Sequence, residues 1–442
     1  MSLFTSIFTG FESPEEKKKF SILAVLFGLT IGVYWLFRPL KDSIFLTMVG
    51  REYQPWAKML SILVTACAVM IYSYLVDKYP RHKLLYGYSG FYALCSIGFA
   101  FFIFDPQMGI SNTVEDPHRY LGWVFYLFVE SFGSTMVALF WSFVADTTTP
   151  ESARRGYSLI VFGAQTGGVI IPLMGKIIIN MSSSGSAILL CVVGICCIPV
   201  GVYYFMLTTP RDQLKGFDGS KNALEKGKKT RTGFLDGLYL VATRPYVLGI
   251  FTMVAFYEVV IVMIDFQFKW LAKAEYTGDA LTNFFTTYAI CINIVAVFSV
   301  LLGSKGIARR LGLARTLLLL PVVVGASAII VNMNPVLGVA FMVMVACKSI
   351  NYSLNQPAKE QLYIPTSKDT KYKAKAWIDM FGIRLSKGTA SGINTLRPIL
   401  GVATFTMMSL GLSAALILVW FWAALFIGKE HTKAIEQDRI VC

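Results

Sequence analysis

Two short basic turns decide the fold: "VDKYPRHKLL" at residues 76–85 and "IARRLGLARTLL" at residues 307–318. Each lies between two long apolar runs, and the two turns occupy matching places in the first and second halves of the chain. This correspondence indicates an internal repeat of membrane helices. The alternative is that both turns only follow the general excess of Lys and Arg in short cytoplasmic loops.

The apolar runs predict an all-α membrane protein. The chain has 442 residues, of which 55% are hydrophobic and 15% charged, and its mean hydropathy is +0.60, outside the range of ordinary soluble domains. About twelve stretches are long enough to span a hydrocarbon core about 30 Å thick, and strand-like alternation is absent. The stretches lie at 20–48, 55–76, 84–104, 120–145, 157–179, 185–208, 246–268, 280–303, 313–331, 336–356, 374–393 and 396–427.

The longest polar connection, residues 209–245, divides these stretches equally. We therefore predict a six-helix N-terminal half at 1–208, a basic cytoplasmic linker at 209–245 and a six-helix C-terminal half at 246–442. This organisation is typical of the major facilitator architecture, in which the substrate site lies near the membrane midplane between the halves. Asp77, Lys78, Arg81 and Lys83 resemble the cytoplasmic loop motif of that superfamily.

The basic residues indicate the topology. A net charge of +14 would suggest a nucleic-acid partner in a soluble protein, but here the predicted partner is the lipid bilayer. The chain has 40 Lys and Arg. About 28 of them fall in the termini and the even-numbered loops, and about 7 in the odd-numbered loops. Both termini should be cytoplasmic. The first twenty residues resemble neither a secretory signal nor a transit peptide, so we expect a bacterial inner membrane. We expect a monomer.

Small residues mark the fifth apolar stretch, "FGAQTGGVIIPLMG". Gly163 and Gly167 stand at the spacing that lets two membrane helices approach closely. A role as a hinge is the alternative interpretation.

Charged residues inside the apolar stretches point to function. A Lys, Arg or Asp at the centre of a membrane helix costs roughly 2.5–3.5 kcal/mol, so such residues should line a polar interior. The candidates are Arg38, Lys41, Asp42, Glu130, Asp146, Glu258, Asp265, Lys269, Lys348, Asp379, Arg384 and Lys387.

In the first stretch, Arg38, Lys41 and Asp42 share one helical face. Pro39 cannot donate to the carbonyl of Trp35, so we expect a kink there. The spacing allows an Arg38–Asp42 ion pair, which would leave Lys41 without a partner in its own segment. This makes Lys41 the better candidate for contact with an anionic substrate.

In other stretches the acids are of two kinds. Asp146 follows the end of an apolar run and is expected to pair with Arg154 or Arg155, whereas Glu130 lies well inside its run and is expected to line the pathway. Asp265 is four residues from Lys269, so a pair within one helix is the alternative to a functional role. In the eleventh stretch, Lys375 stands four residues before Asp379, and Arg384 three before Lys387.

No enzyme site is predicted. His82, His118 and His431 all lie in polar segments, no phosphate-binding GxxxxGK[ST] loop occurs, and no clustered metal ligands are visible in the sequence. We therefore predict a protein without catalytic residues, metal or cofactor.

Several of the charged segments resemble the ATP/ADP translocase family, the nucleotide transporters of plastids and intracellular bacteria. The similar segments are "RPLKDSIFLT" (38–47), "ESFGSTMVALFW" (130–141), "TTTPESARRGYSLIVFGAQ" (147–165), "VVIVMIDFQFKWLAKAEY" (259–276) and "NQPAKEQLYIPTSKDTKYKAKAWIDMFGIRLSKGTAS" (355–391). The resemblance implies a carrier of nucleotides that exchanges ATP for ADP.

The resemblance also implies site residues. The family has a lysine, a glutamate, an acid and a lysine at positions that match Lys41, Glu130, Asp265 and Lys375, with Lys387 as the alternative to Lys375. Asp265 departs from the glutamate usual there, which leaves substrate choice and exchange mode open. Proton-coupled import of other nucleotides, or transport of another organic anion on the same scaffold, are the alternatives.

Overall fold

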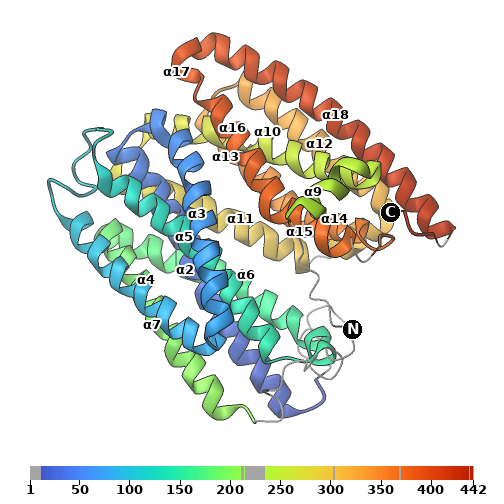
Figure 1. Ribbon diagram of the computed structural model, residues 1–442. Helices are drawn as coiled ribbons and strands as arrows, with labels where there is room; N and C mark the ends of the chain where they lie inside the picture. Colours follow the sequence, from blue (N-terminus) through green and yellow to red (C-terminus); the bar gives the residue numbers. More distant parts are fainter. Residues whose placement is uncertain are drawn as a thin grey trace. The chain divides into compact units, whose positions relative to one another are not determined.

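The computed structural model describes residues 11–210, 214, 234–301, 304–367, 370–437 and 439–441. All the regular structure in these residues is helical, as the sequence predicts (Figure 1). The chain divides into two compact units, one formed by Met1–Gly227 with Lys273–Val297 and the other by Lys228–Ala272 with Phe298–Cys442. Segment Lys273–Val297 thus packs with the first unit, although it falls within the predicted half 246–442.

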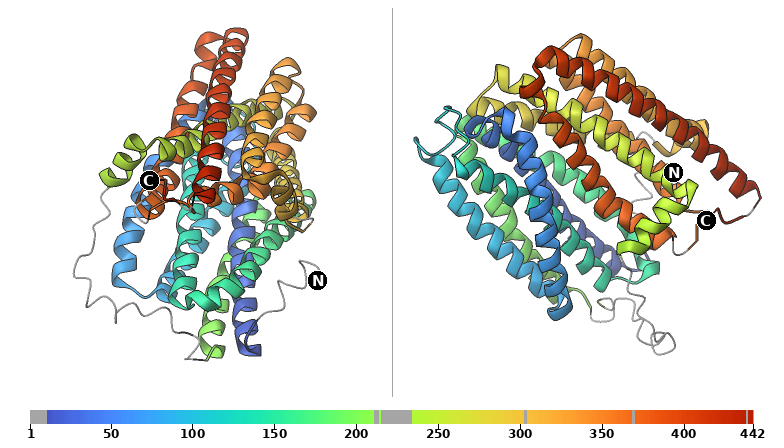
Figure 2. Two further views of the ribbon diagram at one scale, coloured as in Figure 1. Left: turned by 90° about the vertical axis from the view of Figure 1, so that its right-hand side faces the viewer. Right: turned by 45° about the horizontal axis from the view of Figure 1, so that its top comes forward.

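The helices up to residue 208 belong to the first unit. They are α2 (Pro14–Met48), the 3₁₀ turn η1 (Arg51–Tyr53), α3 (Gln54–Lys78), α4 (Arg81–Phe104), α5 (Tyr120–Asp146), α6 (Pro150–Met181) and α7 (Ser184–Thr208). Figures 1 and 2 show these helices, in blue to green, packed side by side as a bundle. We call the end where α2 and α6 finish and α7 begins the far end of the first unit.

The later helices begin with α9 (Phe234–Thr243), which falls inside the predicted linker. They continue with α10 (Pro245–Glu275), α11 (Gly278–Leu301), α12 (Ser304–Met333), α13 (Leu337–Ile350), α14 (Gln356–Leu362), α15 (Lys375–Trp377), α16 (Ile383–Asn394), α17 (Arg397–Leu400) and α18 (Val402–Glu436). Three π-helical segments interrupt them: η2 (Asn351–Asn355), η3 (Thr370–Ala374) and η4 (Ile378–Gly382).

Among the described residues, ten helices are long and apolar enough to cross a membrane. The two other predicted stretches, 336–356 and 374–393, are helical as α13–η2–α14 and η3–α15–η4–α16, except at Val336, which precedes α13. They differ from the ten because π-helical turns divide them and because the second carries several charges. Single π-helical turns inside α-helices are frequent at functional sites.

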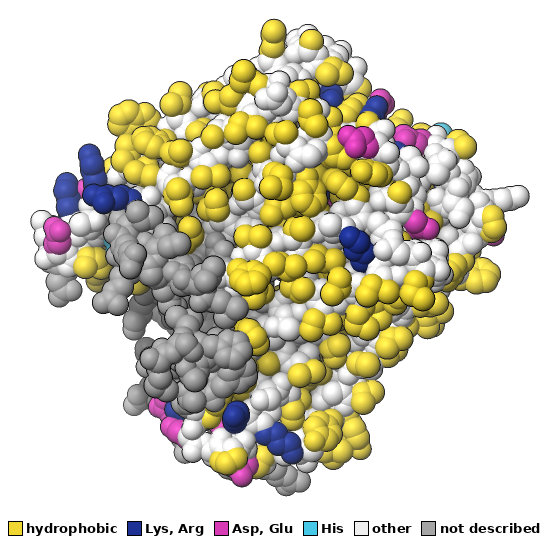
Figure 3. Space-filling model, turned by 180° about the vertical axis from the view of Figure 1, so that it is seen from behind, with side chains coloured by type: hydrophobic (Ala, Val, Ile, Leu, Met, Phe, Trp, Pro, Cys, Tyr) yellow, Lys and Arg dark blue, Asp and Glu magenta, His cyan; other side chains and the backbone are white. Residues whose placement is uncertain are grey.

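Side chains on the outside of the helices suit a lipid environment. Large apolar residues such as Leu94, Phe101 and Met407 are more than 70% exposed. Figure 3 shows hydrophobic side chains over most of the face seen from behind, with few charged groups among them. Such a surface is unfavourable in water and favourable against acyl chains, which confirms the prediction of a multi-pass membrane protein.

Glycines bring α2 and α6 into close contact. A Cβ atom on Gly167 would lie 2.0 Å from the carbonyl oxygen of Gly28, and one on Gly163 would lie 2.3 Å from that of Ala24. No side chain fits at these positions, so Gly163 and Gly167 serve helix packing, as their spacing predicts. This interface fixes the helix that carries Arg38 and Lys41.

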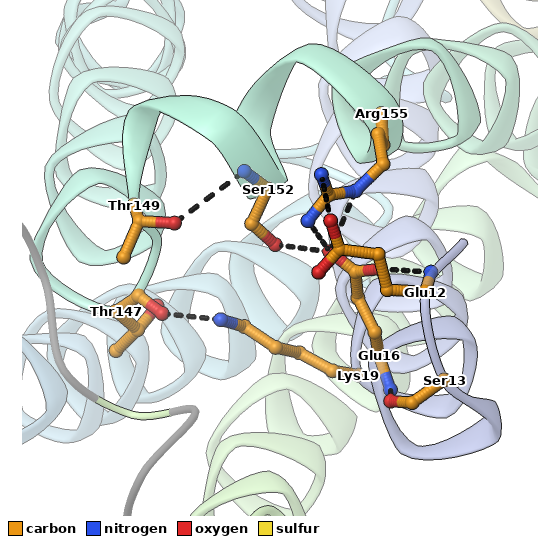
Figure 4. Close-up of polar contacts among 8 residues, drawn as sticks. All are labelled: Glu12, Ser13, Glu16, Lys19, Thr147, Thr149, Ser152 and Arg155. Atoms are coloured by element: carbon orange, nitrogen blue, oxygen red, sulfur yellow. Dashed lines mark hydrogen bonds and ion pairs between the residues drawn. The ribbon is translucent and has the colours of Figure 1, made fainter. Parts of the chain in front are cut away.

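A polar cluster closes the other end of the first unit (Figure 4). Ser13 caps α2 by accepting from the backbone N–H of Glu16 at 3.1 Å, and Thr149 caps α6 by accepting from that of Ser152 at 3.4 Å. Each cap is followed by a proline at the first helical position, as in many helix starts. The two caps place the N-termini of α2 and α6 beside each other.

The carboxylate of Glu16 is the centre of this polar cluster. It accepts from Ser152 Oγ at 2.6 Å and from Arg155 Nη2 at 2.9 Å, and Arg155 Nη1 also contacts Glu12 at 2.7 Å. Lys19 donates to the carbonyl of Thr147, the C-cap residue of α5. The start of α2 is thus fastened to the α5–α6 junction.

At the far end, Arg119 organises the loop between α4 and α5. Its guanidinium donates to the carbonyls of Met108, Gly109, Asn112 and Val114 at 2.7–3.0 Å. These carbonyls have no helical partner, so the single side chain replaces the missing backbone hydrogen bonds.

Candidate functional site

The charged cluster of the first unit lies on α2 and α5. Lys41 Nζ is 2.9 Å from Asp42 Oδ1 and 3.1 Å from Glu130 Oε1. It also lies 4.1 Å from the centre of the Tyr126 ring, a cation–π contact. We call Lys41, Asp42 and Glu130 the Lys41 cluster. Only 4% of Lys41 is exposed, whereas the Glu130 side chain is 31% exposed. The cluster is therefore an ion-pair network with a buried ammonium and a partly exposed carboxylate within a membrane helix bundle.

The expectation that Lys41 lacks a partner in its own segment is wrong. Asp42, its neighbour in the sequence, and Glu130, from another helix, both contact it. A buried ammonium without counter-ions would be far more costly than a paired one, and this explains why two carboxylates converge on it. An anionic ligand at Lys41 would have to compete with both of them.

Arg38 lies on aromatic rings. Its guanidinium carbon is 4.8 Å from the centre of the Trp35 ring and 5.7 Å from that of Tyr34. Tyr34 in turn packs against Gly133 of α5, where a Cβ atom would lie 2.2 Å from the ring. α2 continues as one helix through Pro39, so Arg38 and Lys41 remain one turn apart on it.

The second unit carries its own charges on α10. Asp265 pairs with Lys269 at 3.2 Å, the pair within one helix that their spacing allows. Two turns earlier, Glu258 lies 3.7 Å from Lys387 of α16. The structure therefore brings Lys387, but not Lys375, to the helix that carries Asp265.

Lys375 contacts a different helix. It pairs with Glu360 of α14, and the neighbouring Lys359 lies 3.1 Å from Asp379. α14 supplies Lys359 and Glu360, and the α15–η4 segment supplies Asp379 and Lys375. Two ion pairs of opposite polarity therefore join the two segments. Arg384 is half-buried on α16.

Two further contacts differ from the prediction. Asp146 pairs with Arg81 at 3.1 Å, whereas Arg155 contacts Glu12 and Glu16; the Arg154 side chain lies outside the described residues. Arg81 belongs to the basic turn that opens the sequence argument, so this turn is tied to the end of α5. Side chains of its counterpart at 307–311 also lie outside the described residues.

Sequence reasoning missed Tyr126, Lys359 and Arg397. Arg397, 8% exposed, lies 4.1 Å from the centre of the Trp270 ring. It lies at the very start of the apolar stretch 396–427, where a charge at the end of a membrane helix is common, and only the aromatic ring beside it in the fold distinguishes it. Among the described residues, no group of three His, Cys, Asp or Glu side chains is placed to hold a metal ion.

The architecture defines the class of protein. Solved structures that resemble the chain include a peptide transporter POT (TM-score 0.61, 14% identity, 93% of this chain and 95% of that one) and a D-xylose–proton symporter (TM-score 0.60, 12% identity, 93% and 97%). This likeness shows the fold: a polytopic helical protein built like the major facilitator transporters.

The family follows from the sequence of the same helices. The chain matches the TLC ATP/ADP transporter family over residues 1–337 and 327–431 and belongs to it. It is similar to ADP,ATP carrier protein 4 of Rickettsia bellii, at 26% identity over 488 residues (96% of this chain and 92% of the relative). It is also similar to ADP,ATP carrier protein 1 of Chlamydia muridarum, at 24% over 506 residues (96% and 93%). It is a nucleotide transporter of this family and not an enzyme.

Proposed function

We propose that this protein exchanges ATP for ADP by alternating access across a bacterial inner membrane, with both termini in the cytoplasm. The carrier names of its relatives support the substrate. The distribution of Lys and Arg between the loops supports the orientation, because cytoplasmic loops retain basic residues. In this orientation the far end of the first unit faces away from the cytoplasm.

The Lys41 cluster is the observation that carries the proposal. With Arg38 it holds two cations and two anions, so the resting site is electrically balanced. A polyphosphate takes the place of Glu130 and Asp42 at the buried ammonium, and the carboxylates return when it leaves. Binding is then an exchange of ion partners, which keeps a charge from being buried alone at any step.

The second unit contributes Asp265, Arg384 and Lys387 to the pathway. Glu258 holds Lys387 beside α10, as Glu130 holds Lys41. Lys375 has a structural role instead, because Glu360 retains it in the contact with α14.

Exchange of this kind moves charge. ATP carries about one more negative charge than ADP at neutral pH, and one charge crossing 100 mV changes its free energy by about 2.3 kcal/mol. The membrane potential therefore biases the direction of exchange.

Uptake into proteoliposomes tests the proposal. Labelled ATP, ADP, GTP and NAD are offered to vesicles that are empty or preloaded with ADP, with and without an imposed potential. We expect ATP uptake only into preloaded vesicles and a rate that depends on the potential. Absence of counter-exchange for every nucleotide would refute the proposal.

Proton-coupled import of other nucleotides is the second candidate. Asp265, in place of the glutamate usual in similar transporters, and its contact with Lys269 favour it, because a carboxylate in an ion pair can take up a proton when its partner binds substrate. In the same assay an importer fills empty vesicles and responds to a proton gradient. A carrier of another organic anion shows neither nucleotide counter-exchange nor proton-driven nucleotide uptake.

A further inference from the structure

Polar side chains at the far end join α11 to α2, α6 and α7. These contacts all lie within the first unit, since segment Lys273–Val297 packs there. They are separate from the Lys41 cluster, and neither the sequence argument nor the nucleotide site uses them.

The first contact is a helix cap supplied from another helix. α7 begins at Ser184 and lacks a side-chain cap from its own N-cap residue, Ser183. Asp279 of α11 replaces it: its Oδ1 accepts from the backbone N–H of Ser184 at 2.9 Å and from Ser184 Oγ at 2.5 Å. A carboxylate at a helix N-terminus is favourable, because it meets unpaired N–H groups and the positive end of the helix dipole.

The second contact links this cap to α2. Thr282, one turn after Asp279, has its hydroxyl 2.9 Å from Ser184 Oγ and 2.6 Å from Ser43 Oγ. Ser43 directly follows Asp42 of the Lys41 cluster. A continuous chain of hydrogen bonds therefore runs from Asp279 through Ser184 and Thr282 to the turn of α2 that carries Lys41. We call these four residues, Asp279, Ser184, Thr282 and Ser43, the α11 latch.

The latch is buried. Ser43, Ser184 and Thr282 are each 0% exposed. Ser43 and Thr282 each also donate to a carbonyl of their own helix, Leu40 at 3.1 Å and Gly278 at 3.3 Å. The hydrogen bonds that join the three hydroxyls to one another and to Asp279 form only while α11 lies against α2 and α7. The latch is therefore specific to the arrangement in which α11 contacts α2 and α7.

Further hydrogen bonds beside the latch also join α11 to α2 and α6. Thr47, one turn beyond Ser43, accepts from the backbone N–H of Gly278 at 3.1 Å. On the other side of α11, Lys176 of α6 donates to Thr287 at 2.7 Å, and Asn180 accepts from Asn283 at 2.7 Å. α11 thus runs antiparallel to both α2 and α6, and polar groups fasten it along two turns.

We propose that the α11 latch is the gate of the far end and that Thr282 and Asp279 are positioning residues for the nucleotide site. Opening at this end requires α11 to leave α2 and α7, which breaks the chain of hydrogen bonds next to Asp42. The latch therefore couples closure of this end to the placement of Lys41. It rests on the proposed function for its role in transport, while the gate itself is testable without any nucleotide.

Thiol labelling measures the gate. Thr286 is 0% exposed and lies one turn beyond Thr282, so a Thr286→Cys reporter reacts with a membrane-impermeant thiol reagent only when the far end opens. Labelling of the unmodified protein in right-side-out vesicles gives the background from its native cysteines. Thr282→Val removes the latch hydroxyl at nearly constant volume, and Thr282→Ser retains it.

We expect Thr282→Val to raise the labelling rate of the reporter roughly tenfold, the effect of about two lost hydrogen bonds, and Thr282→Ser to leave it unchanged. Asp105→Asn is the matched control at the same end. Asp105 accepts only from its own loop, from the N–H groups of Gln107 and Met108 at 2.8 Å. If Thr282→Val accumulates poorly, Ser43→Ala removes the same hydrogen bond from the α2 side.

Unchanged labelling in Thr282→Val and Ser43→Ala overturns the latch. Transport adds a readout that a purely structural role would not give: the apparent KM for nucleotide supplied at the far end falls together with Vmax, because the open state is more populated. If Thr282→Val raises labelling but the unmodified protein exchanges no nucleotide, the gate is supported and the proposed function is contradicted. If the unmodified protein exchanges nucleotides but Thr282→Val and Ser43→Ala leave labelling unchanged, the gate is contradicted and the proposed function is supported.

Discussion

Replacing Glu130 by glutamine tests whether nucleotide and carboxylate compete for Lys41. The substitution keeps the size of the side chain and removes one negative charge 3.1 Å from the ammonium. If phosphate takes the place of this carboxylate, the variant binds nucleotide more tightly and releases it more slowly. If Glu130 instead only orients Lys41, the variant binds more weakly.

The structure sets the size of the effect. At an effective dielectric constant of about 20, two unit charges 3.1 Å apart attract by about 5 kcal/mol. The Glu130 side chain is 31% exposed, and solvent screening and desolvation reduce the net contribution of such a pair to about 1–2 kcal/mol. Since about 1.4 kcal/mol is a tenfold change in affinity, we expect the Kd for ATP to fall roughly tenfold.

Calorimetric titration of the purified protein with ATP gives the Kd, and counter-exchange in proteoliposomes gives the turnover. The expected combination is a lower Kd with slower exchange. Asp116→Asn is the control, because it makes the same change of charge in an exposed loop, where we expect no effect on either quantity. A Kd that is unchanged or higher in Glu130→Gln refutes the competition.

Three other substitutions test the helix contacts of the first unit. Gly167→Ala should lower the midpoint of thermal unfolding, at a cost of about 1–3 kcal/mol, because a Cβ atom would lie 2.0 Å from a carbonyl oxygen of α2. Gly98→Ala, where nothing lies within 4 Å of the added atom, should leave the midpoint unchanged. Equal effects of the two substitutions would contradict the packing argument. Arg155→Ala should destabilise by about 1–2 kcal/mol, because the carboxylate of Glu16 loses its cation but keeps its hydrogen bonds from Ser152 and from the backbone N–H of Glu12, and an unchanged midpoint would exclude that role. Arg119→Ala should make the α4–α5 loop sensitive to added protease, and resistance would show that its carbonyl contacts are dispensable.

Contacts within one helix were predictable. The Asp265–Lys269 pair follows from a separation of four residues. Gly163 and Gly167 follow from the small-residue spacing, which places both on one face of α6. The membrane spans follow from length and hydropathy alone, because backbone groups in lipid must form hydrogen bonds within their own helix.

Ion pairs between helices were not predictable from spacing. Reasoning along α2 alone left Lys41 without a partner, whereas Glu130 reaches it from α5. The same limitation assigned Asp146 to the arginines nearest in sequence, although Arg81 is nearest in space. A pattern within one helix gives the direction of a side chain but not the helix that faces it.

The π-helical turns change what the spacing of Lys375 and Asp379 means. Lys375 and Asp379 have the spacing of a pair in a regular α-helix, but η4 begins at Ile378 and changes the rotation per residue there. The two side chains therefore turn to different partners on α14, Glu360 and Lys359. Hydropathy and charge do not distinguish an α-helical from a π-helical turn, so the sequence contains no signal for this change.

Thermal stabilisation by ATP in Lys41→Ala is the most direct test of the nucleotide site, because a ligand raises stability only in proportion to its binding. The unmodified protein and the variant are heated in detergent with increasing ATP, beside Lys359→Ala, which removes another buried lysine that pairs with an acid. We expect ATP to raise the Tm of the unmodified protein and of Lys359→Ala, and to leave that of Lys41→Ala unchanged. An equal rise in Lys41→Ala would contradict the assignment of the Lys41 cluster as the phosphate site.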